Sequence, residues 1–516
     1  MTRHLPEEVH QPAPRDQVSH PVPEASPPGE HRRLCVGMST FDDFDGVFFT
    51  LQAIRMYHPE ILGETSFLVI DNHPEGPAAA HIKQLENSVP NMRYVPFRGY
   101  RSTAVRDLLF REANADIVMC MDSHVILRPG AIRAVLDYFD SRPSSRDMLQ
   151  GPLLADDLVT VVGTHFAPKW GAGIYGQWDT DERIHEAGGQ PFEIEMQGLG
   201  LFACRRDAWP GFNPRFRGFG GEEGYLHEKV RQHGGRVMCL PALAWAHRFG
   251  RPNGPSYDVA WLDRVRNYYI GWDEIGWDVA QIEEAFRDLL NPEAAEILLA
   301  QAANQCANPF RFFDGIFCLN LDGQPERWAK MIERFKLLDI GWRVERFPAI
   351  AAAHGCTHSF RAMISEARRR GYKNILIFED DAVFLDQTLA VVGSALNDLR
   401  QRSWDLLYLG GCVWGQSFSF VEGSRVLQKP SGVITCTHAI AINHTAYDRF
   451  LEEVPSEEGD DFDGFIDQHL AVDQYLDHRI ADGAYEAVVV SPRVATQPVL
   501  MDSPKADLTL RERYII

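Results

Sequence analysis

Two apolar runs of strand length, each ending on side chains that can bind a metal, constrain this chain more than any other feature. The first, IVMCMDSH (residues 117–124), ends on Asp-Ser-His, and the second, NILIFEDD (residues 374–381), ends on Glu-Asp-Asp. A buried strand that stops on such residues places them at the edge of a sheet, where ligands of α/β proteins bind. The sequence therefore predicts two functional sites about half a chain apart.

The first half of the chain alternates between strand-like and helix-like segments. Strands are expected at 34–41, 65–72 and 116–125, and helices at 46–58 and 102–115. This alternation is typical of a doubly wound, mostly parallel sheet, in which the carboxyl ends of strands share one edge. We therefore expect the polar residues that end these strands to lie together.

The domain organisation follows from length and from changes in composition. A length of 516 residues predicts roughly two to four domains. Residues 1–33, rich in Pro, Glu and His without hydrophobic periodicity, predict a disordered tail. An α/β domain is expected over 34–257, a helical connector over 258–310, and a second α/β domain over 311–516.

The net charge of −21 limits the classes of partner. With 72 acidic and 51 basic residues, broad docking on nucleic acid or an anionic membrane is not expected. No stretch approaches the roughly 20 apolar residues of a membrane span, and no signal-peptide core is found, so we expect a cytoplasmic protein. The nine cysteines are scattered without a CxxC pair, so neither a structural zinc nor a disulfide framework is predicted.

Asp122 and His124 form the first candidate metal site. They are two residues apart at a strand end, so both side chains point to one face, with Ser123 turned away. An oxygen and an imidazole nitrogen suit Mn²⁺ better than Mg²⁺ or Ca²⁺, although Mg²⁺ stays possible. The alternative is that Asp122 caps the following turn while His124 packs against the loop.

The segment ADIVMCMDSHVILRPG (115–130) resembles the metal-binding motif of glycosyltransferases with the GT-A fold. Its Asp-Ser-His is similar to that of the polypeptide N-acetylgalactosaminyltransferases and their family 2 relatives. Further segments that resemble the family occur in order: STFDDFDG, GLGLFACRRDAW, GFGGEEGYLHEKV and AWAHRFG. The resemblance covers about residues 34–280 and implies a nucleotide-sugar donor, a divalent metal and a hydroxyl acceptor.

This resemblance also implies roles for individual residues. It implies contacts with the donor nucleotide by Thr40, Asp43, Asp71 and Arg106. It makes His247 the third metal ligand, although a lone His is by default an ordinary loop residue. A cation held by Asp122, His124 and His247 would neutralise the charge that builds up on the departing diphosphate.

Glu222 and Glu223 lie in a Gly-rich loop before a predicted helix. Either residue could remove the proton of the acceptor hydroxyl, and the alternative role is to cap the helix. The resemblance to family 2 favours Glu223 as the base. The polypeptide transferases carry Asn there and retain the sugar configuration, whereas family 2 inverts it, so the stereochemistry stays open.

The second half of the chain resembles glycosyltransferase family 25, which includes lipopolysaccharide and collagen galactosyltransferases. LNLDGQPERW, GCTHSFRAMISEA, ILIFEDDAVF and WDLLYLGG occur in that order, and the resemblance covers about residues 312–505. It implies these site residues: metal ligands Glu379 and Asp381, nucleotide contacts Asn320 and Arg327, and an acceptor-side Asp473. The alternative is a solvated strand end, but adjacent carboxylates repel one another without a cation.

Together these patterns predict a bifunctional, metal-dependent glycosyltransferase with two GT-A-like α/β domains. Each domain would transfer a sugar from a UDP-sugar to a glycan, polypeptide or lipid-linked acceptor, in two sequential additions. In the first alternative only one module catalyses and the other binds the acceptor. A non-catalytic sugar- or peptide-binding protein is the second alternative. A nucleotidyltransferase ranks last, because no Gly-rich loop with an activating Lys occurs near 37–46.

Overall fold

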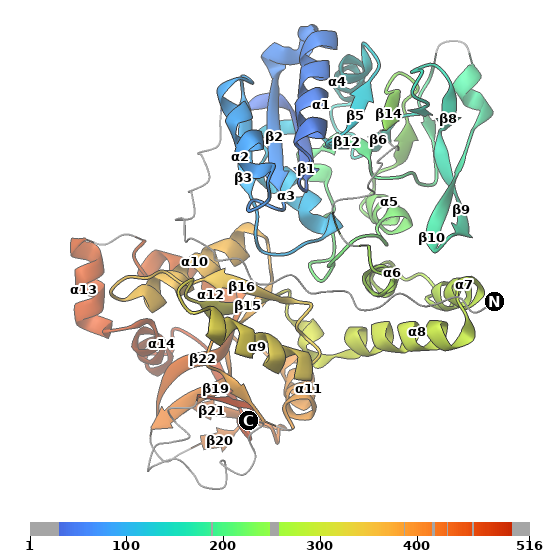
Figure 1. The fold of residues 1–516 in the computed structure, drawn as a ribbon. Coiled ribbons are helices and arrows are strands. Elements are labelled where there is room, and N and C mark those ends of the chain that lie inside the picture. The colour runs from blue at the N-terminus through green and yellow to red at the C-terminus, as the bar shows by residue number, and fades with distance from the viewer. Residues whose placement is uncertain are drawn as a thin grey trace, which may run out of the picture.

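The structure is a computed structural model that describes most of the chain. The described residues are 30–186, 189–247, 257, 259–385, 387–414, 418–430, 432–456 and 459–497. Most of the predicted tail, most of 251–258 and everything from 498 onward lie outside them. Two α/β units, each built on an eight-stranded sheet, lie one above the other in Figure 1, which confirms the predicted α/β class.

The sheet of the first unit has the strand order β11-β13-β6-β12-β4-β1-β2-β3. Its strands are β1 (Arg32–Thr40), β2 (Thr65–Asp71), β3 (Met92–Pro96), β4 (Ala115–Asp122), β6 (Met148–Gln150), β11 (Phe192–Glu193), β12 (Leu201–Arg205) and β13 (Val237–Cys239). β1, β2, β3 and β4 run parallel, whereas β12 is antiparallel to β4. The register places Thr40 beside Asp71 and Ser39 beside Asp122, so three strands end on polar residues at one edge.

Helices cover both faces of this sheet. They are α1 (Phe44–Tyr57), α2 (Ala79–Gln84), α3 (Asp107–Glu112), α4 (Ala131–Asp140) and α5 (Glu223–Gln232), with the 3-10 turns η1 (Pro59–Glu64), η2 (Leu85–Asn87), η3 (Thr103–Arg106), η4 (Glu182–His185) and η5 (Arg206–Ala208). α1, α2 and α4 pack on one face, and α3 and α5 pack on the other. Val36 of β1 faces the first layer and Cys35 the second, as alternation along a strand requires.

β1 begins two residues before the predicted domain boundary. Arg32 and Arg33 lie in this strand, where the sequence predicts the end of the tail. Their guanidinium groups form ion pairs with Glu30 and Glu64, and all four side chains are partly exposed. Charged residues therefore occupy the start of a strand that becomes fully buried at Leu34.

Two small sheets extend the first unit. One contains β5 (Val125–Leu127), β14 (Trp245–His247), β7 (Leu153–Leu154) and β8 (Val161–Gly163), and the other pairs β9 (His165–Gly171) with β10 (Ile174–Asp179). β5 starts three residues after Asp122 and pairs antiparallel with β14, which places His247 opposite Val125. This pairing brings the distant His247 to the end of β4.

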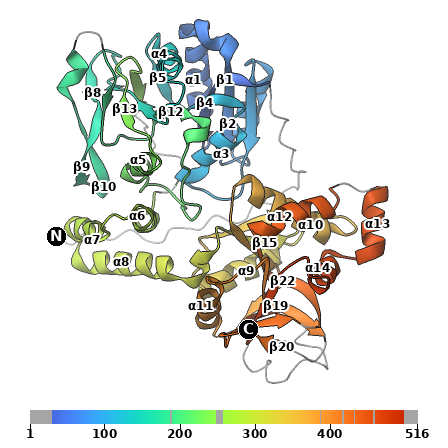
Figure 2. The same ribbon diagram turned by 180° about the vertical axis from the view of Figure 1, so that it is seen from behind.

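Three helices and a 3-10 turn link the two units: α6 (Trp261–Ile275), α7 (Ala280–Leu289), α8 (Pro292–Ala307) and η6 (Pro309–Phe312). In Figure 2, α8 runs from α7 toward the second unit. α6 contributes Ile270 and Ile275 to the core layer that contains α3 and α5. The first helix of the predicted connector is therefore part of the packing of the first unit.

The sheet of the second unit has the order β16-β15-β17-β22-β19-β23-β21-β20. Its strands are β15 (Gly315–Asn320), β16 (Val344–Pro348), β17 (Asn374–Glu379), β19 (Leu406–Trp414), β20 (Phe418–Phe420), β21 (Leu427–Pro430), β22 (Val433–Asn443) and β23 (Ala487–Val490), and β18 (Val383–Phe384) pairs separately with β24 (Ala495–Thr496). β16, β15 and β17 are parallel, and β22 is antiparallel to β17. Glu379 is the last residue of β17, so the second predicted strand end is also the carboxyl end of a strand.

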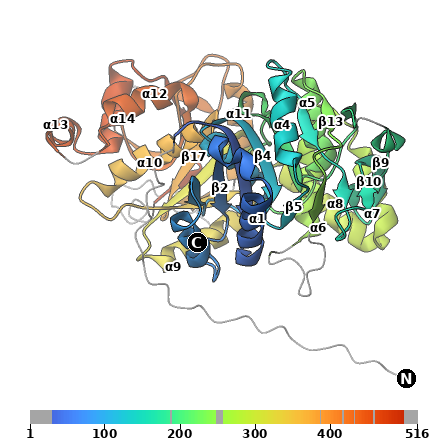
Figure 3. The ribbon, with the colours of Figure 1, turned by 90° about the horizontal axis from the view of Figure 1, so that it is seen from above.

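Helices also cover both faces of the second sheet. They are α9 (Pro325–Leu337), α10 (Gly355–Arg369), α11 (Thr388–Leu399), α12 (His444–Glu453), α13 (Asp460–His469) and α14 (Val472–Ala481). α9 and α11 pack on one face, and α10, α12 and α14 on the other. Seen from above in Figure 3, α13 and α14 lie at one end of the molecule and β9 and β10 at the other. None of the described helices is both long enough and apolar enough to cross a membrane.

Candidate active sites

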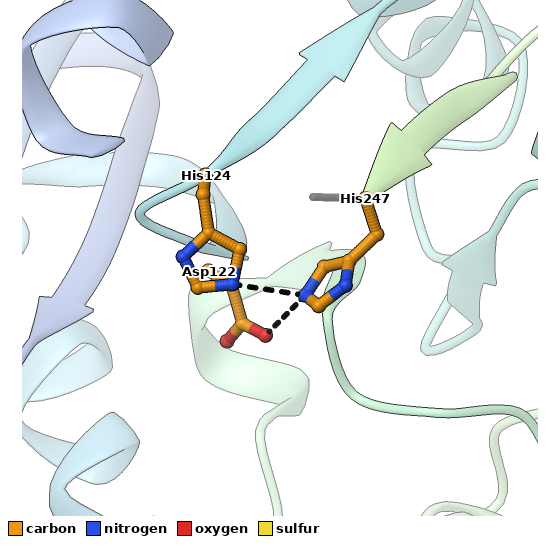
Figure 4. Close-up of side chains that lie close together, drawn as sticks. All are labelled: Asp122, His124 and His247. Carbon is orange, nitrogen blue, oxygen red and sulfur yellow. Dashed lines mark hydrogen bonds and ion pairs between the residues drawn. The ribbon is translucent and has the colours of Figure 1, made fainter. Parts of the chain in front are cut away.

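Asp122, His124 and His247 converge at the carboxyl end of β4 (Figure 4). Nε2 of His247 lies 3.1 Å from Oδ2 of Asp122 and 3.1 Å from Nε2 of His124. Among the residues that the structure describes, these three form the one group of His, Cys, Asp or Glu side chains whose ligand atoms all lie within 4.8 Å of one another. The sequence-predicted ligands are therefore brought together, and their atoms suit a first-row divalent cation.

Asp43 orients His124 for this role. Its Oδ2 lies 2.9 Å from Nδ1 of His124, and it also accepts a hydrogen bond of 2.8 Å from the Ser123 hydroxyl. With a proton on Nδ1, Nε2 carries the lone pair that a metal requires, and a carboxylate behind a ligating histidine is the usual second partner. Ser123 was predicted to turn away, but its hydroxyl oxygen lies 3.4 Å from Nδ1 of His124 on the same side as Asp43. Asp43 was predicted to contact the nucleotide, and the structure gives it this additional partner.

Local packing explains how Asp43 is held. It is the N-cap residue of α1, where its Oδ1 accepts a hydrogen bond of 3.1 Å from the backbone N–H of Gly46. A Cβ atom on Gly46 would lie only 2.3 Å from Asp43 Oδ2 and 2.7 Å from the Ser123 carbonyl oxygen. Glycine is therefore needed for the close approach of α1 to the Asp-Ser-His turn. Burial raises the pKa of Asp43, but hydrogen bonds from His124, Ser123 and Gly46 outweigh it and lower the pKa overall.

Arg106 connects the candidate metal site to the Gly-rich loop. It is buried, donates a hydrogen bond of 2.9 Å to Oδ1 of Asp122, and lies 3.9 Å from Oε1 of Glu222. Burial opposes ionisation of Asp122, but the contacts with His247 and Arg106 outweigh it and lower its pKa. Asp122 is therefore ionised and keeps Oδ2 free of Arg106 and directed toward the two histidines.

Glu222 and Glu223 differ in their surroundings. Glu222 is 2% exposed, and burial, reinforced by the charge of Glu223, raises its pKa to about 8. Glu223 begins α5, is partly exposed, and also has a raised pKa because of burial. The preceding loop reaches them through three glycines with positive φ, Gly218 at 70°, Gly220 at 95° and Gly221 at 89°, a conformation that other residues rarely adopt.

A cavity of about 660 Å³ opens beside this site. Its wall includes Asp122 and His124 at the strand edge and the arginines Arg101, Arg106, Arg217 and Arg266. This volume lies in the range of about 300–1,000 Å³ that small-molecule sites occupy. Glu222 and Glu223 are not part of its lining, but Arg106, which is, lies 3.9 Å from Glu222.

The other predicted nucleotide contacts of the first unit lie at different depths. Thr40 lines the cavity, and its buried hydroxyl has no partner among the described residues. Asp71 is 1% exposed and accepts hydrogen bonds from the Tyr94 hydroxyl, at 2.7 Å, and from the His73 backbone N–H, at 2.9 Å. Burial raises the pKa of Asp71. Asn72, the next residue, reaches the cavity instead.

The carboxylates at the end of β17 are already paired with protein groups. Arg327 lies 3.0 Å from Oδ1 of Asp380 and donates a 3.0 Å hydrogen bond to Oδ2 of Asp381. Gln497 Nε2 donates to Glu379 at 3.2 Å and to Asp381 at 3.0 Å. The mutual repulsion of these carboxylates is thus relieved by Arg327 and Gln497 within the chain, without a requirement for a bound cation.

The remaining predicted residues of the second unit surround this strand end. Asn320 ends β15 and donates a 2.7 Å hydrogen bond to Asp380. Glu379 accepts a 2.9 Å hydrogen bond from the Thr437 hydroxyl, and burial raises its pKa to about 7. Asp473, in the first turn of α14, accepts a 3.0 Å hydrogen bond from the backbone N–H of Cys436. Arg327, which was predicted to contact the donor nucleotide, therefore pairs with acidic side chains of the protein.

Several residues of these sites were not predicted from the sequence. Gln497 and Thr437 contact Glu379 although 118 and 58 residues separate them from it. Trp342 and Glu345, of the second unit, line the cavity of the first. Thr437 and Gln497 did carry a signal, because they lie within THAIAINHTAYDRFL and VATQPVLMDS, two later segments that also resemble glycosyltransferase family 25.

Comparisons with known proteins add the following. No protein-family model and no curated protein matches the chain. Among solved structures, it is similar to GalNAc-T7 with UDP, GalNAc and Mn²⁺, at 12% identity and a TM-score of 0.39, over 50% of this chain and 55% of that one. It is also similar to Staphylococcus aureus TarS 1–349 in complex with UDP-GlcNAc, at 12% identity and a TM-score of 0.32, over 78% and 97%. The chain thus spans about half the length of the GalNAc-T7 structure.

Proposed function

We propose that the chain is a glycosyltransferase that uses a UDP-sugar donor in its first α/β unit. The observation that carries this proposal is the convergence of Asp122, His124 and His247 beside an arginine-lined cavity, whose wall includes Asp122 and His124. A bound cation and guanidinium groups with their paired donors can together neutralise the charge of a diphosphate.

The metal fits the residues that would hold it. Asp122 Oδ2, His124 Nε2 and His247 Nε2 would be the ligands, with Mn²⁺ favoured by the mixed oxygen and nitrogen donors. A cation bound there supplies positive charge opposite the diphosphate that leaves the donor. Arg106 holds Asp122 in place and keeps its second oxygen occupied.

The residues of the chain divide the transfer step between them. The acceptor hydroxyl oxygen forms a bond to the anomeric carbon as the bond from that carbon to the diphosphate breaks, and UDP departs. Glu223 takes the hydroxyl proton, because the more buried Glu222, with a pKa of about 8, is mostly protonated at neutral pH. Glu222, next to the base in the chain, lies 3.9 Å from Arg106, which donates a hydrogen bond to Asp122.

We further propose a second transfer site at the end of β17, so that the enzyme is bifunctional. Glu379 and Asp381 are the proposed metal ligands there, with Asn320 and Arg327 on the donor side and Asp473 on the acceptor side. Glu379, Asp381, Arg327 and Asn320 meet around one strand end, which supports a shared role. Two transfers in one chain fit the sequential addition of two sugars to one acceptor.

One observation favours the alternative in which only the first unit catalyses. Arg327 and Gln497 occupy oxygens of Asp380, Asp381 and Glu379 that a metal would need. In this alternative the second unit binds the acceptor and a cation is not required there.

Release of UDP from a panel of UDP-sugars, with Mn²⁺ present, tests both versions. The wild type is compared with Asp122→Ala/His124→Ala and with Glu379→Ala/Asp381→Ala. If each double variant loses turnover of a different donor, the bifunctional enzyme is supported. If only the first double variant loses turnover, the second unit is not catalytic. If the wild type releases no UDP from any donor, the proposal of a UDP-sugar transferase is contradicted.

A further inference from the structure

The cavity beside the candidate metal site has walls from both units. Most of its lining comes from the first unit, but Trp342, Val344 and Glu345 come from β16 of the second unit and the turn before it. The Asp122–His124 edge therefore accounts for only part of this cavity. The other part lies against the second unit.

Five residues that line this cavity each carry a buried polar atom without a hydrogen-bond partner among the residues described. Within the described part of the chain, no hydrogen-bond partner is found for Nε of Arg106, Arg217 and Arg266 or for the hydroxyls of Thr40 and Thr103. All five residues are at most 7% exposed. Buried donors without partners are costly, so their concentration at one cavity indicates a polar ligand rich in acceptor oxygens.

Trp342 holds one of these arginines from the side of the second unit. The guanidinium carbon of Arg266 lies 4.0 Å from the centre of the Trp342 ring, and Arg266 donates a 2.6 Å hydrogen bond to Asp263. The indole N–H donates to the Asp339 carbonyl oxygen at 3.1 Å, which fixes the ring. Arg266 also donates to Gln305 at 2.9 Å and to the Arg217 carbonyl oxygen at 3.3 Å, so Nε is the guanidinium nitrogen without a partner among the described residues. Stacking on an aromatic ring orients a guanidinium without occupying its N–H groups.

Glu345 holds the other interfacial arginine. It is 2% exposed, and its two carboxylate oxygens accept hydrogen bonds from Arg217 at 3.0 Å and from Arg370 at 2.5 Å. Arg217 directly precedes Gly218, which starts the loop that carries Glu222 and Glu223. A carboxylate of the second unit thus binds the residue before the loop that carries Glu222 and Glu223.

We propose that the second unit completes the ligand site of the first, with Trp342 and Glu345 as positioning residues that orient Arg266 and Arg217 toward a nucleoside diphosphate. The identity of this ligand rests on the function proposed above. The unpartnered donors and the two-unit wall are independent of it. The first unit then requires the second for binding of its donor, whether or not the second unit catalyses a reaction of its own.

Equilibrium binding of UDP with Mn²⁺ tests this inference. The parent is the full chain with Glu379→Ala/Asp381→Ala, so that binding at the second strand end does not contribute. In this parent, Trp342→Ala and Glu345→Gln should weaken UDP binding by about five- to tenfold, and Trp342→Phe should restore most of the affinity. Binding of Mn²⁺ alone should be unchanged, because neither residue contacts a ligand of the metal.

Two control variants match these changes. Trp328→Ala removes another partly exposed tryptophan of the second unit, on α9, which does not line the cavity. Glu366→Gln removes another carboxylate that pairs with Arg370, but one without a contact to Arg217. Both controls should bind UDP as the parent does, and thermal unfolding of every variant separates lost binding from lost folding.

Each outcome has a distinct meaning. If Trp342→Ala and Glu345→Gln bind UDP as tightly as the parent, the inference is overturned and the proposed function stands. If the controls lose as much affinity as the test variants, the effect is general and the inference is also overturned. A parent that binds Mn²⁺ but no UDP contradicts the proposed function and, with it, the assigned ligand. Should Trp342→Ala fail to fold, Glu345→Gln and Trp342→Phe decide the matter.

Discussion

The ends of β4 and β17 are built on the same local topology but carry different chemistry. Each strand is parallel to one neighbour and antiparallel to the other. Each is followed by a short strand, β5 or β18, that pairs antiparallel with a strand from much later in the chain. The late strand ends on His247 in the first unit, and Gln497 directly follows it in the second. His247 and Gln497 therefore occupy similar positions, because each reaches the acidic strand end from the late strand that pairs with the short strand.

The difference lies in what balances the carboxylates. At β4, one carboxylate meets two imidazoles, and Arg106 contacts only one of its oxygens. At β17, three carboxylates meet Arg327 and the amide of Gln497. An amide N–H donates and cannot ligate a cation, whereas an imidazole nitrogen can. The comparison teaches that the strand end offers three converging ligand atoms in one unit, whereas its carboxylates are paired with protein groups in the other.

The largest expected effect comes from His247→Ala. This change removes the proposed metal ligand on β14. It should lower Mn²⁺-dependent turnover of the donor used by the first unit by more than about 100-fold, because loss of a group that only supports a metal ligand already costs about 10- to 100-fold. Initial rates of UDP release measure it, with His185→Ala, an exposed histidine, as the control. Unchanged turnover would show that His247 is not a metal ligand and would contradict the comparison with Gln497.

Asp43→Asn tests whether His124 needs its carboxylate partner. Mn²⁺ affinity should fall by about 10- to 100-fold, because the orientation and basicity of His124 depend on Asp43. Asparagine is also a good N-cap residue, so α1 should be affected little. Titration of Mn²⁺ followed by electron paramagnetic resonance measures the affinity, and Asp45→Asn, an exposed acid in the same turn, is the control. Equal affinities for the two variants would contradict the role of Asp43.

Arg327→Gln sharpens the comparison from the second unit. Without this guanidinium, Asp380 and Asp381 lose their internal cation. Mn²⁺ should then bind the end of β17 several-fold more tightly, because it takes the place of the guanidinium as the opposite charge beside the ionised carboxylates. The same titration, in a background of Asp122→Ala/His124→Ala, measures it. Lys330→Gln, one turn further along α9, should have no effect. Weaker Mn²⁺ binding in Arg327→Gln would show that Arg327 supports a metal there and does not replace it.

The smallest expected effect is a change in stability with pH for Glu222→Gln. The pKa of Glu222 rises from 4.5 to about 8 on folding because of burial, so the folded state keeps a proton that the unfolded state releases. The wild type should therefore lose stability as pH rises from about 4.5 to about 8, and the variant should not. The melting temperature of the variant relative to wild type should increase by a few degrees between pH 5 and pH 8. Glu228→Gln, on the same helix, is the control, and a constant difference would contradict the burial of Glu222 as a neutral acid.

Much of the fold and part of the first site could be predicted from the sequence. Strand length, alternation and polar strand ends are local properties, so Asp122 and His124 could be placed at a sheet edge. His247 could be placed only through the resemblance of AWAHRFG to a family motif. The roles of Asp43 and Gln497 could not be predicted, because they depend on contacts with residues 81 and about 116 positions away.

The contribution of Trp342 and Glu345 lies beyond sequence patterns for a further reason. It depends on how one unit sits on the other, which neither hydrophobic periodicity nor a motif within one domain encodes. Asp71 is a case in which the sequence pattern predicts too much. A polar residue at a strand end is expected to contact ligand, but Asp71 is buried and accepts a hydrogen bond from the Tyr94 hydroxyl. Burial of such a residue depends on the side chains of the neighbouring strand, here β3.

The number and location of tight Mn²⁺ sites test the central claim most directly. Equilibrium titration of Mn²⁺, followed by electron paramagnetic resonance, would compare wild type with Asp122→Ala/His124→Ala and Glu379→Ala/Asp381→Ala. We predict one tight site that the first double variant abolishes and the second leaves intact. The bifunctional version adds a second, weaker site that Glu379→Ala/Asp381→Ala alone removes. A tight site that survives Asp122→Ala/His124→Ala and disappears in Glu379→Ala/Asp381→Ala would contradict the assignment of the metal to the end of β4.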